Sequence, residues 1–155
     1  LARYRLDNAT VAHLVRRYRE LTPELAVPRT VALPGAMAAV RAVAERGGRS
    51  VVVTGKFAAN AVSHLDALGI EVAAVVGDVW STGKAPALRE LGAEVYVGDH
   101  IGDVTAARAA DAMAVAVATG PNSAEDLAAS GADVVLPDLS RFPAWLSSYL
   151  VATVH

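Results

Sequence analysis

The sequence predicts a doubly wound α/β fold, and three observations point to it. Five short runs rich in valine and alanine alternate with segments of helical character. Each run is continuously apolar, as expected for strands covered on both faces, and strands that alternate with helices indicate a parallel sheet. With 155 residues, 54% of them hydrophobic, the chain is long enough to enclose one sizeable core.

The N-terminal third is expected to hold two helices joined by a linker. Asp7-Asn8 can cap a helix over residues 9–21, and the three-proline stretch 22–35 is interpreted as the linker. A second helix is expected from Pro34 to the glycine pair at 47–48. The apolar residues at helical spacing, expected to face inward, are Val11, Leu14, Val15 and Tyr18 in the first helix and Met37, Val40 and Ala44 in the second.

The remaining chain alternates strand and helix, with glycines ending several of the helices. Strands are expected at residues 50–53, 72–76, 94–97, 113–118 and 133–136. Helices are expected at residues 55–69, 84–91, 104–111, 123–130 and 142–150.

Composition and charge exclude several classes of protein. The net charge of −2 gives no indication of nucleic-acid binding, and Arg16, Arg17 and Arg19 are interpreted as a solvated helix face. No apolar run reaches the ~18 residues that a membrane span needs, and no N-terminal targeting signal is recognisable. The absence of cysteine excludes disulfides, thiolate metal sites and cysteine nucleophiles. We therefore expect a cytoplasmic protein.

Two acids follow the third predicted strand in the segment GDHIGD. Ligands of such sheets bind beyond the carboxyl ends of the strands, where Asp99 and Asp103 are expected to lie. Two neighbouring carboxylates repel unless a cation separates them, and Mg²⁺ prefers one or two carboxylates with water and phosphate oxygens. The alternative is that Asp103 caps the following helix and Asp99 caps its own loop.

Two further residues at strand and helix ends suit anion binding. Thr54 follows the first strand, where its hydroxyl and the N–H groups of the next helix can hold an anion; the alternative is a helix N-cap. Lys84 begins a helix, where a cation opposes the macrodipole, as expected if it faces a bound anion; the alternative is a solvated lysine. With the acid pair, they describe a phosphoryl site.

The order of these motifs resembles the haloacid dehalogenase (HAD) superfamily of hydrolases: an apolar strand ending in Thr, a Lys at a helix start, and an apolar strand followed by GDxxxD. The segment from Gly102 to Leu146 is similar to the phosphoglycolate-phosphatase-like branch, and the whole resemblance covers residues 31–150. It implies a Rossmann-like three-layer sandwich with a mostly parallel sheet over residues 31–155. Residues 1–30 then correspond to a remnant of a helical cap and its linker.

The resemblance also implies roles for the candidate residues. Thr54 and the Gly55 N–H would bind phosphate, Lys84 would neutralise it together with the attacking carboxylate, and Asp99 and Asp103 would hold Mg²⁺. The implied activity is hydrolysis of a small phosphorylated metabolite through an aspartyl-phosphate. Lys56 receives no role. Three other polar residues are expected on helix or loop surfaces and not as ligands: Asn60, His64 and His100.

The sequence departs from the family in one respect: it contains no DxDGT-type motif, which carries the family's nucleophile and general acid. The first acid, Asp7, follows no predicted strand. In the family this motif ends a central strand, and its loss would leave two unpaired sheet edges. Because the chain begins with Leu1, we expect the strand in an upstream segment. The alternatives are a strand from another chain or a second copy, and a degenerate member without activity.

Three other functions remain as alternatives. A non-catalytic module would keep the phosphate and metal half-site and act by binding an anion or a partner. A phospho-acceptor receiver-like domain could use Asp99 as the acceptor, but it needs an acid pair near the first strand that is absent. A dehalogenase of the same family needs no metal, so the GDxxxD pair favours a phosphatase. No nucleic acid or membrane partner is expected.

Overall fold

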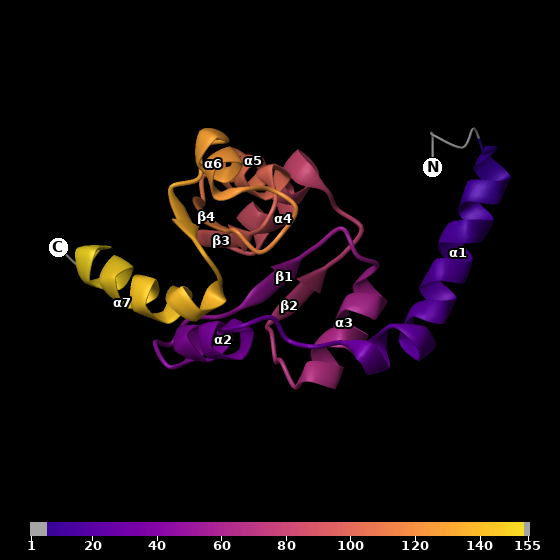
Figure 1. Ribbon diagram of the computed structural model, residues 1–155, viewed down its shortest axis with the longest axis horizontal. Helices are drawn as coiled ribbons and strands as arrows, with labels where there is room; N and C mark the ends of the chain where they lie inside the picture. The colour runs from indigo at the N-terminus through magenta and orange to yellow at the C-terminus, as the bar shows by residue number, and fades with distance from the viewer. Residues whose placement is uncertain (1–5, 154–155) are drawn as a thin grey trace.

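The computed structural model describes residues 6–153, in which helices alternate with five short strands (Figure 1). The strands are β1 (Val51–Val53), β2 (Ala74–Val76), β3 (Val95–Gly98), β4 (Met113–Val117) and β5 (Val134–Leu136). The α-helices are α1 (Asn8–Leu25), α2 (Ala36–Ala44), α3 (Ala58–Leu68), α4 (Ala85–Glu90), α5 (Ile101–Ala109), α6 (Ala124–Ala129) and α7 (Phe142–Thr153). Short 3₁₀ turns are η2 (Val27–Arg29), η3 (Ser81–Lys84) and η4 (Leu139–Arg141).

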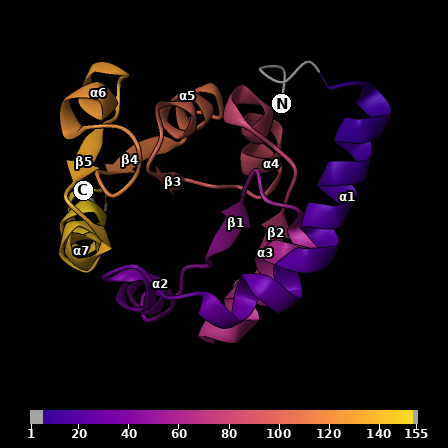
Figure 2. The same cartoon turned by 45° about the vertical axis from the view of Figure 1, so that its right-hand side comes forward.

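All strand pairs are parallel, which confirms the predicted α/β class. β1 pairs with β2, and β3, β4 and β5 form a second group in that order. The described residues thus form two parallel sheets of two and three strands, where the sequence predicted one. Figure 2 shows β1 on the side of β2 that faces β3, so the strands run β2, β1, β3, β4, β5 across the molecule.

Helices cover both faces of the three-stranded sheet. Successive side chains of a strand point to opposite faces. On β3, Tyr96 packs with the cluster formed by α4 and α5, whereas Val97 packs with Phe142 and Leu146 of α7. Residues 114–117 of the central strand β4 are all buried. Burial on both faces explains why these strands read as continuous apolar runs.

Within residues 6–153, the edges of β1 and β3 that face each other have no strand partner. Ser50 O accepts from Ala73 N and Thr54 N donates to Val76 O, so the backbone groups of Val51 and Val53 point away from β2. Glu94 O likewise accepts from Met113 N of β4. The backbone N–H and C=O groups of Val95 and Val97 therefore point away from β4. Between the two edges runs a side-chain bond, from the Tyr96 hydroxyl to Val53 O, 2.8 Å.

The first helix is longer than predicted. α1 continues through Pro23 to Leu25 and η2 follows, so the interpretation of residues 22–29 as linker was wrong. Proline removes the N–H that would bond to the carbonyl four residues earlier, on Arg19. The amide of Asn60 on α3 donates to that carbonyl at 3.3 Å. A tertiary contact therefore compensates the lost helical bond.

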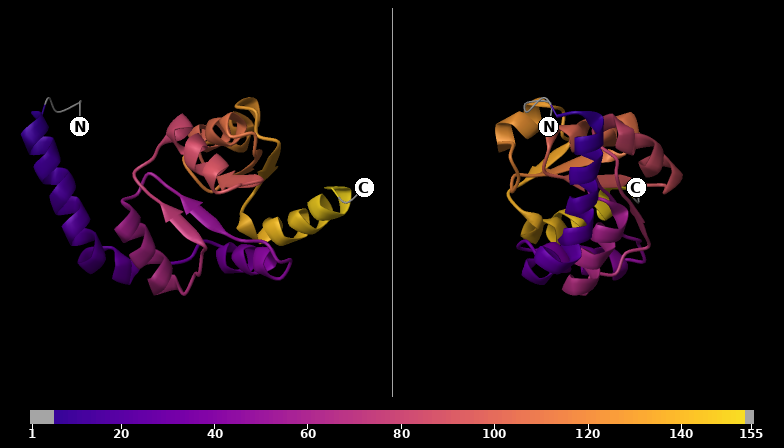
Figure 3. Two further views of the ribbon diagram at one scale, coloured as in Figure 1. Left: turned by 180° about the vertical axis from the view of Figure 1, so that it is seen from behind. Right: turned by 90° about the vertical axis from the view of Figure 1, so that its right-hand side faces the viewer.

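Two predicted inward faces are exposed. Leu14, Val15 and Tyr18 of α1 are accessible to solvent, and Figures 1 and 3 show α1 projecting along one end of the molecule. Met37 of α2 is also exposed, because α2 packs against α7 through a different face. That face is formed by the buried residues Ala39 and Ala42.

The other elements were predicted correctly in type, with shifts at their ends. The ends shift by up to three residues, and α5 starts at Ile101, three residues before the predicted start. Asp103 therefore lies within the first turn of this helix. Gly69 follows α3 in a left-handed conformation, as expected of a glycine that ends a helix. Among the described residues, no helix combines the length and apolarity that crossing a bilayer requires.

Candidate functional site

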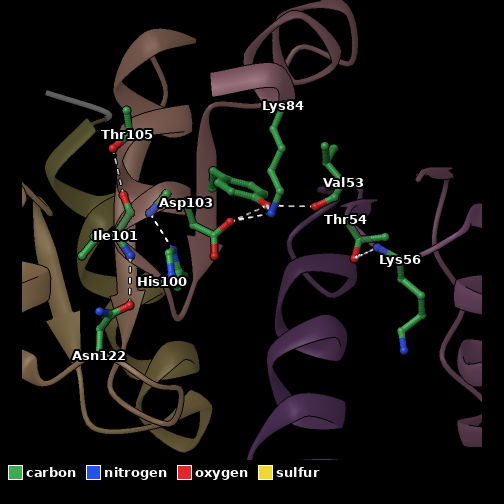
Figure 4. A network of polar contacts seen from close by, with 11 residues as sticks. Val53, Thr54, Lys56, Lys84, His100, Ile101, Asp103, Thr105 and Asn122 are labelled. Atoms are coloured by element: carbon green, nitrogen blue, oxygen red, sulfur yellow. Dashed lines mark hydrogen bonds and ion pairs between the residues drawn. The ribbon is translucent and has the colours of Figure 1, made fainter. Parts of the chain in front are cut away.

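A lysine and a carboxylate form a shielded ion pair at the carboxyl ends of the strands. Lys84 Nζ lies 2.5 Å from Asp103 Oδ1, and their side chains are only 12% and 13% exposed. Lys84 Nζ also donates to the Tyr96 hydroxyl at 3.0 Å (Figure 4). The structure therefore brings two of the predicted site residues into direct contact.

Local structure explains how the pair is brought together. Lys84 ends η3 and stands at the N-cap position of α4, as the sequence predicted. Asp103 lies in the first turn of α5, where a carboxylate interacts favourably with the helix dipole. Asp103 lies directly over Gly98, because a β-carbon on that glycine would be 2.3 Å from the Asp103 β-carbon. Only glycine permits this approach.

The network keeps Lys84 charged. Burial lowers the pKa of its ammonium group, but the hydrogen bonds to Asp103 and Tyr96 outweigh burial, so that the pKa is raised. Burial raises the pKa of the Tyr96 hydroxyl, which therefore stays protonated at neutral pH. The site thus presents an ammonium group with one carboxylate neighbour and a neutral phenol.

Tyr96 is a site residue that the sequence reasoning missed. Its hydroxyl donates to Val53 O at 2.8 Å and lies 3.3 Å from Asp103 Oδ1, so it joins β1 to the ion pair. The signal in the sequence is a tyrosine within a strand otherwise made of small apolar residues, two positions before Gly98. Which neighbour its hydroxyl reaches depends on the tertiary structure.

Thr54 lies at the end of β1, one residue beyond the carbonyl that Tyr96 contacts. Its hydroxyl accepts from Lys56 N at 3.2 Å, which forms a local turn. The N-cap of α3 is Phe57, so Thr54 does not cap that helix. Gly55 follows with the Trp80 indole lying against it. No hydrogen bond within residues 6–153 joins Thr54 to Lys84 or Asp103.

Asp99 lies at the same edge but outside the ion-pair network. Its carboxylate packs against Gly120 in the loop after β4, where a β-carbon would be 2.4 Å from Asp99 Oδ2. In the described part of the chain, no hydrogen bond or ion pair connects Asp99 with Lys84 or Asp103. The two acids therefore pack against different glycines: Asp103 against Gly98 at the end of β3, and Asp99 against Gly120 after β4.

The two carboxylates at this edge are oxygen donors of the kind that Mg²⁺ prefers. Residues 6–153 contain no group of three or more His, Asp or Glu side chains able to hold a metal. Mg²⁺ commonly takes one or two carboxylates and completes its shell with water and phosphate oxygens. Lys84 contacts Oδ1 of Asp103, so Oδ2 and the Asp99 carboxylate are the oxygens that suit the cation.

The first two N–H groups of α5 already donate to the side chains of His100 and Asn122. Gly102 N donates to the His100 ring and Ile101 N donates to Asn122 Oδ1 (Figure 4). His100 therefore caps the helix, and it is exposed as predicted. An anion at this edge has to use other donors, among which are the Thr54 hydroxyl and Lys84.

The remaining polar candidates have structural roles. The expectation that Asn60 lies on the surface was wrong: it is 2% exposed and bonds to Arg19 O. Arg19 in turn pairs with Asp78 at 2.7 Å and lies over the Phe57 ring, so it is not simply solvated. His64 is half-buried, with Nδ1 against the Thr30 hydroxyl.

Comparisons with known proteins identify the family. A model described as haloacid dehalogenase-like hydrolase matches residues 2–108, and a model of HAD-hydrolase-like proteins matches residues 85–142. Phosphoglycolate phosphatase from Rhodospirillum rubrum is 35% identical over 153 residues. That match covers 90% of this chain but only 63% of the relative's length.

Solved structures show the same fold at low sequence identity. A predicted phosphatase from Clostridium acetobutylicum has a TM-score of 0.80 at 19% identity, covering 95% of this chain and 74% of that one. A hydrolase from Pseudomonas syringae has a TM-score of 0.76 at 20% identity, covering 92% and 74%. With the family model that matches most of its length, these likenesses show that the chain belongs to the haloacid dehalogenase-like hydrolases.

Proposed function

We propose that this chain is the larger part of a Mg²⁺-dependent phosphatase that hydrolyses a small phosphate monoester. The observation that carries the proposal is the shielded contact between Lys84 and Asp103, 2.5 Å, at the carboxyl ends of the strands. A lysine held there by one carboxylate supplies positive charge where phosphoryl oxygens would gather. The relative named phosphoglycolate phosphatase supports a small phosphorylated substrate.

Different residues of the chain bind the phosphate and the metal in this proposal. Lys84 neutralises phosphate oxygens, while the Thr54 hydroxyl and Gly55 N–H donate to them. Asp99 and Asp103 hold Mg²⁺, which would add positive charge opposite the transferring phosphoryl group. Tyr96 acts through its neighbours, because its hydroxyl fixes the position of both Lys84 and Val53.

The sequence contains no DxD motif that would carry the nucleophile of the proposed reaction. We propose that an extended segment inserts between β1 and β3 and carries an aspartate at its carboxyl end. Within residues 6–153, the N–H of Val53 and the backbone groups of Val51, Val95 and Val97 have no strand partner, while Val53 O accepts only from the Tyr96 side chain. This supports the proposal, because a parallel strand would bond to both edges. The aspartate would form an aspartyl-phosphate, which water then hydrolyses.

Ligand binding by this chain tests the half-site without the nucleophile. Isothermal calorimetry with inorganic phosphate and Mg²⁺ is expected to show binding to the wild type. Asp103→Asn and Lys84→Met should each weaken phosphate binding by about tenfold or more. This is the loss of affinity expected when one charge-assisted hydrogen bond is removed. Asp66→Asn, an exposed acid on α3, is the matched control and should bind as wild type. Equal affinity in all four proteins would refute the site.

Turnover separates the enzyme from a non-catalytic module. The absence of a DxD motif from the sequence favours the module as a second candidate. The complete reading frame that encodes this chain should hydrolyse p-nitrophenyl phosphate, and EDTA should abolish the activity. Phosphate binding without any magnesium-dependent turnover of that protein would favour the module instead.

A further inference from the structure

A loop from β2 crosses the end of β1 and reaches α5. Asp78 N donates to Lys56 O at 3.0 Å, and Val79 N donates to Thr54 O at 3.2 Å. At its far end, Ser81 approaches Gly102 within 3.5 Å of where a β-carbon would be. The segment from Gly77 to Lys84 therefore covers the Thr54–Lys56 turn.

Trp80 lies at the centre of this loop, with its pyrrole edge against Gly55. A β-carbon on Gly55 would be 2.2 Å from the indole Nε1 and 2.6 Å from Cδ1. No side chain fits at position 55 while the indole occupies this place. The contact thus fixes Trp80 beside the backbone N–H that the proposed site uses for phosphate.

Most of the Trp80 side chain remains accessible. The residue is 65% exposed, although its pyrrole edge is covered. Single exposed apolar residues are ordinary on protein surfaces. Trp80 differs because one edge is fixed at Gly55 and Lys84 follows four residues later on the same loop. A large exposed aromatic surface therefore lies beside Gly55, whose N–H the proposed site uses for phosphate.

We propose that Trp80 is a specificity-determining residue, which packs against the group esterified to the phosphate and favours a flat aromatic or heterocyclic group. The proposal rests on the phosphate site proposed above. Stacking on an indole rewards planar groups, and small aliphatic groups gain little from it. Phenyl phosphate should consequently bind more tightly than ethyl phosphate.

Calorimetric affinities for three ligands test this on the 155-residue chain with Mg²⁺. Wild type should prefer phenyl over ethyl phosphate by about tenfold, which corresponds to the usual worth of an aromatic contact. Trp80→Ala should abolish the preference and leave inorganic phosphate binding within about twofold. Trp80→Phe, which keeps a ring, should retain most of the preference.

Fluorescence provides an independent readout. In a Trp145→Phe background Trp80 is the single tryptophan, since the sequence has two. Trp145 stacks with Tyr149 on α7. Phenyl phosphate should change the Trp80 emission more than ethyl phosphate does.

The outcomes separate the two proposals. If inorganic phosphate fails to bind the wild type, the proposed phosphate site is refuted, and the proposed role of Trp80 is refuted as well. If phosphate binds but the phenyl and ethyl esters bind equally, only the role of Trp80 is refuted. If Trp80→Ala weakens all three ligands alike, Trp80 merely supports the Gly55 turn, and the specificity proposal is again refuted.

Discussion

Lys84 and Asp103 differ from the ion pairs of α1 in how little water reaches them. Arg16 and Arg17 pair with Glu20 on an exposed helix face, where such contacts contribute little to stability. The Lys84–Asp103 pair is shielded, so that removing one partner leaves a poorly solvated charge. Retaining such a pair without a ligand is costly, which is consistent with a binding role.

Gly120→Ala tests whether the Asp99 carboxylate needs its present position. The new methyl group would displace the whole Asp99 side chain, because it would lie 2.4 Å from Oδ2 and 2.7 Å from the Asp99 β-carbon. We expect Mg²⁺ affinity to fall by about tenfold and the melting temperature to decrease as well. Gly83→Ala, where no atom lies within 4 Å of the new carbon, should bind Mg²⁺ as wild type does. A normal affinity in Gly120→Ala would contradict the role of Asp99.

His64 predicts a pH dependence of stability. Burial, and secondarily the charge of Lys56, lowers the pKa of His64 below its ordinary value of 6.5. The unfolded chain therefore binds the proton first as the pH falls through 6.5, and stability is lost as the pH decreases below about 7. The drop in melting temperature from pH 7.5 to 5.5 should be smaller for His64→Gln than for wild type. His13→Gln, on the exposed face of α1, should behave as wild type.

At the scale of elements, a residue of α3 replaces a hydrogen bond that Pro23 removes from α1. α1 passes through a proline that leaves Arg19 O without its helical donor, and the buried Asn60 amide on α3 takes that place. The same segment is held by the Arg19–Asp78 ion pair. α1 is therefore fixed to the loops beyond β1 and β2 by its second half, and its first half projects (Figure 3).

A double-mutant cycle tests this exchange of hydrogen bonds. Asn60→Ala should destabilise the protein by about 1–3 kcal/mol, since it removes a buried hydrogen bond. In a Pro23→Ala background the helix supplies its own donor to Arg19 O, and the cost of Asn60→Ala should be smaller. Urea denaturation gives the four free energies of unfolding. Additive effects would mean that Asn60 acts elsewhere than on Arg19 O.

At the scale of the whole molecule, the parallel sheet is interrupted between β1 and β3. The two halves are joined there by the hydrogen bond from the Tyr96 hydroxyl to Val53 O and by the loop between β2 and α4, which crosses the end of β1 and contacts α5. Unpaired parallel edges invite another strand. The interruption therefore links the fold to the function, because the proposed nucleophile would arrive on the strand that fills it.

Amide hydrogen exchange measures whether the interruption is open in solution. The N–H groups of Val53 and Val97 point into it and should exchange much faster than that of Ala116 in β4. If they are protected as strongly as Ala116, a strand already fills the space, and sedimentation analysis would show whether a second copy supplies it. Protection that appears only in the complete reading frame would support the inserted segment.

The regular β-α alternation could be predicted from sequence because each strand is short and apolar, and because glycines follow the ends of α3, α4 and α6. The failures have a common cause. The inward faces of α1 and α2 were predicted from helical spacing, which identifies an apolar face but not whether an element covers it. Likewise, Pro23 is a helix breaker in sequence, and only the Asn60 contact lets the helix continue.

For the candidate site, the sequence identified residue types and their order, and these were enough to indicate a phosphoryl site near Thr54, Lys84, Asp99 and Asp103. It did not indicate Tyr96 or Trp80, whose importance lies in contacts with residues distant in the chain. It also did not reveal that the first two N–H groups of α5 donate to the side chains of His100 and Asn122.

The sequence by itself determined the α/β class and the placement of polar residues after the strands, because both depend on local periodicity and on the residues that end helices. Only the tertiary structure decided that Lys84 pairs with Asp103 while Asp99 rests on Gly120. It also decided that two edges with no strand partner among the described residues face each other. These features depend on how separate elements pack, and packing joins residues that no local pattern connects.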